Sequence, residues 1–254
     1  MFGIAMLKMG QKADRLTEVF DEINIVAILS NSYLNRFISA YVGLMVSGLI
    51  MSGQLAVISG FWKLLLIVIA GEAATLIAYT IVVCTRLKVN VRTFLHKLLP
   101  SFMISLTSAN VGAAFTTTID TLIGPLGVDA DFAPMAYNLG GILFRPGYCI
   151  VFTACSLFTA DLYGIVVTWV WLLAAFLLSF ILSVATPPVV GGTTVCFSIL
   201  FSQLGIKAEA LSVIISVNAV FEFLTVAVNN YCLQSQIVLL GNRFDKLNHN
   251  RLRT

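Results

Sequence analysis

The chain has 254 residues, of which 59% are hydrophobic and only 11% are charged, and its formal net charge is +3. Soluble domains carry about 25% charged residues, so a water-soluble fold of this chain would expose far more apolar surface than a monomer tolerates. The composition therefore excludes a soluble domain and predicts an integral membrane protein. The basic residues form short clusters beside apolar segments, which argues against nucleic-acid binding.

Motifs for catalysis and metal binding are absent from the sequence. The five cysteines form no C-x-x-C pair, and His96 and His249 both lie near basic clusters. The chain has no H-E-x-x-H or G-x-S-x-G motif, and no two carboxylates fall in a plausible common pocket. We therefore expect no enzymatic activity, no cofactor and no metal site.

The first segments in chain order are one amphipathic and two apolar stretches. Residues 11–35 alternate charged and apolar side chains at helical spacing, which fits a helix at the membrane surface, with a soluble linker helix as the alternative. Residues 37–59 carry no charge and are long enough to span a bilayer. Residues 62–84 form a second predicted span, which is interrupted by Glu72.

A basic loop over residues 86–97 follows these spans, and the positive-inside rule places it in the cytoplasm. The next segment, 98–126, has a small polar centre from Ser105 to Asn110. A lipid-facing helix would not gather so many small polar residues, whereas the tip of a re-entrant hairpin would, because it is buried in protein or lines a cavity. We therefore predict a hairpin that enters the membrane and returns.

Residues 132–160 form an apolar stretch that is interrupted in its middle. Gly140 and Gly141 are followed by Arg145-Pro146-Gly147. Proline removes a backbone donor and clashes with the preceding turn, so a continuous helix cannot pass through it undisturbed. Discontinuous helices of this kind mark ion and substrate sites in transporters.

The run from 163 to 204 carries no charge and divides near Thr186-Pro187-Pro188 and Gly191-Gly192. Its second arm is too short to span, so we predict a second re-entrant hairpin. The last segment, 210–240, is long enough for a helix but polar along one side, and a basic tail follows. With both hairpins re-entrant, the loop over 86–97 and the tail fall on the same, cytoplasmic side.

Local sequence adds specific landmarks to this order of elements. They are Gly3-Ile4-Ala5 at the start, Thr107-Ser108-Ala109 at the first tip, Pro188 through Gly192 at the second tip, and Glu222 and Asn229, seven apart on the last helix. Together with the order of spans and hairpins, they resemble the carboxy-terminal part of the sodium:dicarboxylate (glutamate transporter-like) symporter family. The resemblance covers nearly the whole chain.

The sequence departs from the family pattern at the broken helix. The family carries N-M-D-G-T there, with oxygens that help to bind sodium, whereas this chain has Phe144-Arg145-Pro146-Gly147-Tyr148. On the last helix, the family's arginine for the substrate carboxylate falls at Thr225, and its aspartate falls at Leu233. Sodium prefers hard oxygen ligands, so the coupling ion stays open between a proton and sodium.

The resemblance implies an all-α integral membrane protein with transmembrane helices, two re-entrant helical hairpins and a broken helix, without the family's first four scaffold helices. Residues 1–60 are then an amphipathic helix and a scaffold-like span, and residues 243–254 a basic cytoplasmic tail. Residues 61–242 are the transport domain, with hairpins over 92–127 and 163–205.

Arg145 is the most informative single residue, because a charge at membrane depth costs about 3 kcal/mol on insertion scales and therefore needs a partner. One alternative is a structural pair with Glu222, if the two helices are neighbours as the family fold implies. The other is a bound carboxylate, which a guanidinium holds through two hydrogen bonds. Glu222 is also the candidate for ion coupling through a bound proton, and Glu72 is a second candidate.

Helix ends at the hairpin tips offer unpaired N–H groups that attract anions. With the family matches, they define the candidate substrate-binding residues: Thr107, Ser108, Asn110, Arg145, Thr186, Gly191, Gly192, Thr225 and Asn229.

Two functions remain open from the sequence. The first is a symporter-like secondary transporter in the plasma membrane for a small carboxylate-bearing solute, such as an amino acid or a dicarboxylate, coupled to a cation or a proton. The second is a truncated or degenerate membrane subunit that does not transport alone. Expected partners are the solute, the lipid bilayer, and either further copies of the chain or a partner chain that supplies scaffold helices.

Overall fold

The computed structural model describes residues 55–187 and 192–253, together with scattered helical residues nearer the amino terminus: Arg15, Leu16, Glu18, Val19, Glu22, Ile23, Val26 and Ser47. The chain divides into two compact units, Met1–Tyr41 and Val42–Thr254. The amphipathic helix predicted over 11–35 and the span predicted over 37–59 lie almost entirely outside the described residues.

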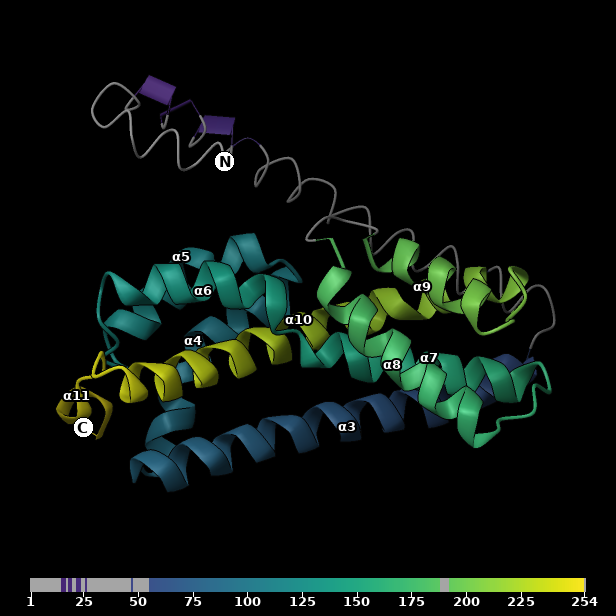
Figure 1. Ribbon diagram of the computed structural model, residues 1–254, viewed down its shortest axis with the longest axis horizontal. Helices are drawn as coiled ribbons and strands as arrows, with labels where there is room; N and C mark the ends of the chain where they lie inside the picture. The colour runs from purple at the N-terminus through teal and green to yellow at the C-terminus, as the bar shows by residue number, and fades with distance from the viewer. Residues whose placement is uncertain are drawn as a thin grey trace. The chain divides into compact units, whose positions relative to one another are not determined.

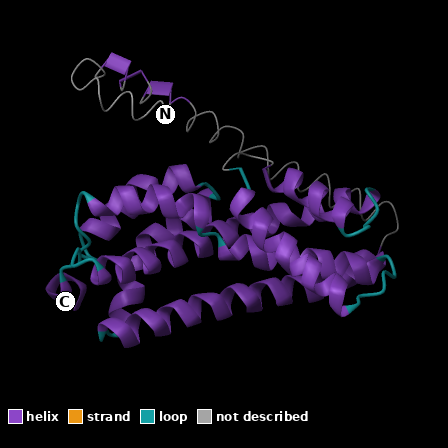
Figure 2. Cartoon of the chain, viewed as in Figure 1, coloured by secondary structure: helices purple, strands orange, loops and turns teal. Residues whose placement is uncertain are grey.

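The described part of the second unit is helical, and short loops join the helices (Figure 2). The helices are α3 (Leu55–Leu87), α4 (Val91–Ser108), α5 (Val111–Ile123), α6 (Phe132–Leu143), α7 (Pro146–Leu162), α8 (Trp169–Ala185), α9 (Gly192–Gln203), α10 (Glu209–Arg243) and α11 (His249–Arg253). Extended pairing within the described ranges is limited to one bridge, between Val128 and Leu247. The predicted all-α class is therefore confirmed.

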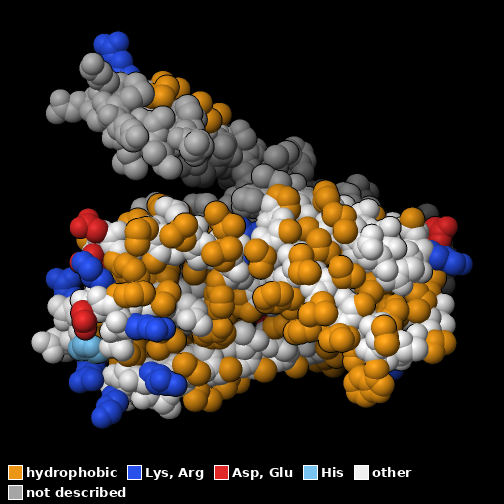
Figure 3. Space-filling model, viewed as in Figure 1, with side chains coloured by type: hydrophobic (Ala, Val, Ile, Leu, Met, Phe, Trp, Pro, Cys, Tyr) orange, Lys and Arg blue, Asp and Glu red, His pale blue; other side chains and the backbone are white. Residues whose placement is uncertain are grey.

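Within the described ranges, three helical segments are long and apolar enough to cross a bilayer: Phe61–Leu87, Phe132–Leu162 and Val220–Arg243. The space-filling view shows hydrophobic side chains over the visible face between two ends where charged side chains gather (Figure 3). Large apolar residues such as Trp62, Trp169 and Phe180 are exposed on this unit. An apolar belt between charged ends is what a bilayer requires of the surface that it surrounds.

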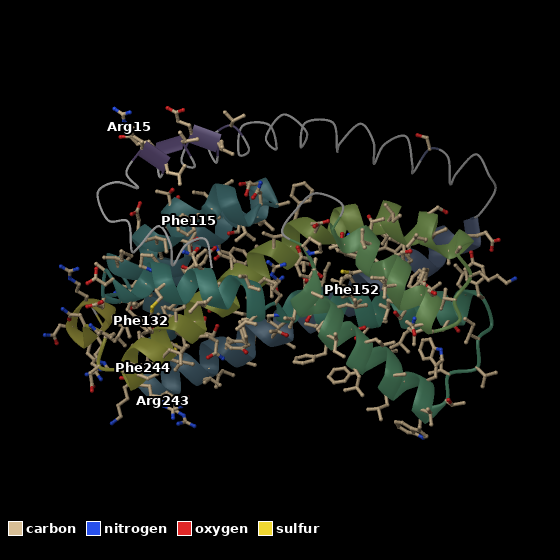
Figure 4. The ribbon with its side chains drawn as sticks, turned by 45° about the horizontal axis from the view of Figure 1, so that its top comes forward. Arg15, Phe115, Phe132, Phe152, Arg243 and Phe244 are labelled. Atoms are coloured by element: carbon tan, nitrogen blue, oxygen red, sulfur yellow. The ribbon has the colours of Figure 1, made fainter. Side chains whose placement is uncertain are left out.

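The long helices α3 and α10 run the length of the unit, with α4, α5 and α6 grouped at one end and α7, α8 and α9 at the other (Figure 1). Two apolar cores follow this division. The first, around α7–α9, includes Phe152, which stacks on Tyr148 and meets Phe197 edge-on. Figure 4 shows Phe152 in this end, with Phe115, Phe132 and Phe244 in the other.

Helices α4 and α5 form a helical hairpin, hereafter hairpin 1. Asn90 caps the start of α4 by accepting the N–H of Arg92. Ala109 adopts a left-handed conformation (φ 48°) that ends α4, and Asn110 caps α5 by accepting the N–H groups of Gly112 and Ala113. The turn therefore falls at the end of the polar segment that predicted it, because asparagine side chains satisfy the free N–H groups of a helix start.

Helices α8 and α9 form the arms of a second hairpin, hereafter hairpin 2. Thr168 caps α8, and the indole N–H of Trp171 donates to the carbonyl of Leu204 at the base of the opposite arm (3.1 Å). The predicted tip over 188–191 lies outside the described residues. That each hairpin enters the membrane and leaves it on the same side stays a prediction.

The broken helix is interrupted later than its glycines. Gly140 and Gly141 remain inside α6, where the missing side chain of Gly140 leaves room for Leu233 of α10. The helix ends before Phe144, and α7 begins at Pro146, which is tolerated in a first turn because its missing N–H would be unbonded there. The interruption therefore consists of Phe144 and Arg145.

Candidate solute-binding site

Arg145 lies in the interruption between α6 and α7 and reaches hairpin 2. Its Nε donates to the carbonyl oxygen of Gly141 (2.7 Å), and its Nη1 donates to the carbonyl oxygen of Thr186 (2.6 Å). Thr186 is the residue that ends α8, where backbone carbonyls lack partners within the helix. The guanidinium thus ties the start of α7 to the inner end of a hairpin arm.

The structural pair between Arg145 and Glu222 does not form, so that alternative of the sequence analysis is wrong for this structure. The only ion pair among the described residues joins Lys246 to Asp129. Glu222 instead accepts a hydrogen bond from Asn218 Nδ2 (3.3 Å). Among the described residues, Arg145 has two neutral carbonyl partners and no counter-ion.

Around Glu222 the polar groups come from three helices. Asn218 Nδ2 also donates to the hydroxyl of Thr193 in α9 (3.0 Å), and the hydroxyls of Thr193 and Tyr148 face the Glu222 carboxylate. Glu222 is half-buried. This arrangement places the predicted ion-coupling residue against hairpin 2 and the start of α7.

The first turn of α7 also contacts the final long helix. The N–H of Gly147 donates to Asn229 Oδ1 (2.7 Å), and both groups are buried. A Cβ at position 147 would lie 3.0 Å from Asn229 Oδ1 and 3.0 Å from Thr225 Cγ2. Glycine is therefore needed for this approach, and it brings Asn229 and Thr225 to the helix start beside Arg145.

Thr225 makes a contact that the sequence analysis missed. Its hydroxyl donates to Glu72 Oε1 of α3 at 2.6 Å, and Glu72 is completely buried. The signal was present in the sequence as a single acidic residue inside an apolar span. Its partner could not be found from sequence, because the two residues are 153 positions apart.

The predicted residues of hairpin 1 form a separate group. Thr107 donates to the carbonyl oxygen of Met103, Ser108 donates to that of Ile104, and Asn110 caps α5. These bonds stay within hairpin 1. The structure thus joins Arg145 to Thr186, and Asn229 to the start of α7 near Thr225, while the hairpin 1 tip has its own local bonds.

The remaining predicted residues lie at the start of α9. Gly192 is buried, and a Cβ there would lie 2.5 Å from the carbonyl oxygen of Pro187, so the close turn requires glycine. Gly191 is outside the described residues. Over the described ranges, no three His, Cys, Asp or Glu side chains are grouped closely enough to hold a metal ion.

Comparison with known protein families matches the chain to the sodium:dicarboxylate symporter family over residues 1–232. The matched range includes both hairpins, the interruption at Arg145, and α10 through Asn229. No curated protein sequence matches the chain.

Proposed function

Because the chain belongs to the sodium:dicarboxylate symporter family, we propose that it is a secondary active transporter of a small carboxylate-bearing solute, such as an amino acid or a dicarboxylate. Transport proceeds by alternating access and is coupled to a proton or another cation. The protein is a multi-pass membrane protein, and we place it in the plasma membrane with the loop over 86–97 and the carboxy terminus in the cytoplasm.

The single observation that carries the solute class is the bonding of Arg145. Its positive charge is half-buried within a membrane-spanning segment, and its partners in the described part of the chain are the backbone carbonyls of Gly141 and Thr186. A charge at that depth is costly without a counter-charge. A carboxylate supplies the counter-charge and matches the planar, two-point geometry of a guanidinium.

The helix start beside Arg145 favours the same ligand. Pro146 and Gly147 open α7, and the amino end of a helix attracts anions through its free N–H groups and its dipole. One of these N–H groups already donates to Asn229, whose own Nδ2 has no partner among the described residues. Arg145 therefore binds the carboxylate, and Asn229 orients a polar group of the solute.

Hairpin 2 is the element whose bonds change on binding. An incoming carboxylate competes with the Thr186 carbonyl for Nη1 of Arg145. A charged acceptor forms the stronger hydrogen bond, so solute binding alters the contact that holds the inner end of α8. Glu222 of α10 is linked to Thr193 of α9, and so to hairpin 2, through Asn218.

The test is uptake into liposomes that contain the purified protein. Radiolabelled L-aspartate and succinate serve as probes, with either a sodium gradient or a pH gradient imposed. Hydrogen bonds to a charged group contribute about 1.5–3 kcal/mol, so Arg145→Ala should lower uptake at subsaturating solute by at least about tenfold. The matched control is Arg86→Ala, which removes an exposed arginine from the end of α3.

Uptake by Arg145→Ala at the wild-type rate would contradict the assignment of Arg145. Absence of uptake from folded wild-type protein with every gradient would instead favour a subunit that needs a partner chain.

A further inference from the structure

The strongest unexplained feature outside the Arg145 site is the carboxyl group of Glu72. It lies in the middle of α3, inside the first membrane-capable segment, and its side chain is completely buried. Oε1 accepts the hydroxyl of Thr225, whereas Oε2 has no hydrogen-bond partner among the described residues. Buried polar atoms are nearly always bonded, so an unbonded carboxyl oxygen requires an explanation.

The packing around Glu72 holds the group away from water. The adjacent Gly71 lets α7 approach closely, because a Cβ there would lie 2.9 Å from Ile150. Helix α10 covers the other side through Thr225. Glu72 therefore lies where three helices meet, on a helix that contacts both the broken helix and the final long helix.

The ionisable neighbours on the two covering helices carry no positive charge. On α10, Cys232 interacts electrostatically with Glu72. On α7, Tyr148 and Cys149 are the ionisable residues nearest to Ile150 in the sequence. Neither α7 nor α10 places a Lys, Arg or His side chain within 4 Å of the Glu72 carboxyl group.

Helix α4 also packs against α3, and its basic residues are Arg92, which is exposed, His96 and Lys97. His96 is exposed, and the ammonium group of Lys97 donates to the backbone carbonyls of Arg251 and Leu252. No cation lies within 4 Å of Glu72 among the described residues. An ionised carboxylate buried without a counter-charge is strongly unfavourable, so the neutral acid is the stable form of Glu72 in this conformation.

A continuous set of contacts links this group to the solute site. Thr225 bonds Glu72, Asn229 lies one turn further along α10, and Asn229 accepts the N–H of Gly147, two residues after Arg145. Both Glu72 Oε2 and Asn229 Nδ2 are buried without partners. A rearrangement at the start of α7 therefore changes the groups that surround the Glu72 carboxyl.

We infer that Glu72 is the site of the transported proton, which binds to its carboxyl group on one side of the membrane and leaves on the other as solute is carried across. The step is a proton transfer alone: the O–H bond forms at Oε2 from a proton of the bulk solution and breaks to water on the opposite side. This inference rests on the proposed transport function. It assigns the coupling ion as a proton and moves its binding position from Glu222 to the buried α3 carboxyl.

The first arm of the test measures protonation without any solute. Infrared spectroscopy of the purified protein near pH 7 detects the C=O stretch of neutral carboxyl groups, whereas exposed acids are ionised at that pH. A neutral-carboxyl band should be present in wild type and in Glu222→Gln, and Glu72→Gln should lose the component of the band that arises from Glu72. The amide oxygen introduced at position 72 can still accept the Thr225 hydroxyl, so packing is retained. A band of unchanged position and intensity in Glu72→Gln would overturn the inference.

The second arm measures coupling in liposomes with radiolabelled succinate and L-aspartate. For one co-transported proton, an inward acid gradient of one pH unit supports up to about tenfold accumulation. Glu72→Gln should lose this response while it still exchanges internal unlabelled solute for external labelled solute. Glu72→Asp should regain part of the response, and Glu209→Gln, an exposed acid at the start of α10, should behave as wild type.

The outcomes separate the two proposals. Gradient-driven accumulation by Glu72→Gln equal to wild type, or its loss in Glu222→Gln alone, would overturn the role of Glu72 and leave the transport function standing. Lack of uptake of both probes by wild type would count against the transport function, and the infrared arm would still decide whether Glu72 holds a proton.

Discussion

The two hairpins are held to the rest of the unit by different kinds of bond. Hairpin 1 is fixed by neutral side chains: Asn230 of α10 donates to Ser105 (2.7 Å) and Thr118 (3.0 Å) and accepts from Tyr137 (3.1 Å). Hairpin 2 is held at its inner end by Arg145, through the carbonyl of Thr186. One attachment is a set of buried amide and hydroxyl groups, and the other depends on a charge that has no counter-ion among the residues the structure describes.

This difference predicts that a solute can replace a hydrogen bond of hairpin 2 but none of those that hold hairpin 1. The side-chain amide of Asn230 is hydrogen-bonded to partners from α4, α5 and α6. A solute therefore has no weaker acceptor to replace in hairpin 1. In hairpin 2 a solute carboxylate is a better acceptor for Arg145 than the Thr186 carbonyl is. We therefore expect solute to act on hairpin 2 and to leave hairpin 1 unchanged.

The largest predicted effect is on stability, through hairpin 1. Asn230→Leu removes three buried hydrogen bonds, and at about 0.6 kcal/mol each in a membrane protein it should lower the free energy of unfolding by about 2 kcal/mol. Unfolding by denaturing detergent in mixed micelles measures this change. The control is Asn138→Leu, an exposed asparagine on α6; equal effects of the two variants would show that the Asn230 bonds do not fix hairpin 1.

The second prediction concerns local opening rather than global stability. Arg145→Ala removes the bond to Thr186, so backbone amides over 192–203 should exchange with deuterium on the order of tenfold faster, which corresponds to about 1.4 kcal/mol of local opening. Amides of α4 and α5 should exchange at unchanged rates. If amide exchange became equally faster in both hairpins, Arg145 would not hold hairpin 2 specifically, and the proposed difference between the hairpins would be wrong.

The smallest prediction concerns the base of hairpin 1. The Phe132 N–H, together with nearby Lys246, lowers the pKa of the Asp129 carboxyl from its ordinary value of 3.8. A lowered folded-state pKa means that the stabilisation is present above about pH 4 and is lost as pH falls through the folded-state pKa. The melting temperature of wild type should fall slightly towards that of Asp129→Asn on acidification, whereas Asp120→Asn should follow wild type throughout. A difference in melting temperature between wild type and Asp129→Asn that stays the same at every pH would contradict this prediction.

Within the described residues, local signals in the sequence indicated where two helices begin. The polar run before Val111 located the turn of hairpin 1, and Pro146 located the start of α7, because caps and proline act over one or two residues. The family was also identified from this order of elements. The glycine pair was less informative, since Gly140 serves close packing against Leu233 rather than the interruption.

The partners of the buried polar groups were not predictable from sequence. Arg145 was expected to meet Glu222 or a ligand, but its Nη1 bonds a carbonyl 41 positions away. Backbone carbonyls occur at every residue, so no residue type identifies such an acceptor. Likewise, the sequence around Glu72 and around Thr225 does not indicate that α3 and α10 pack so that these two side chains meet.

The measurement that tests the central claim most directly is thermal stabilisation of the purified protein in detergent by succinate, L-aspartate and the uncharged analogue succinamide. A ligand that binds only the folded state stabilises it, by about 2.7 kcal/mol at a concentration of 100 Kd. We predict that at least one of the two carboxylates raises the melting temperature of wild type but not of Arg145→Ala, and that succinamide raises neither. Equal stabilisation of wild type and Arg145→Ala, or none in folded wild type, would contradict the claim that Arg145 binds the solute carboxylate.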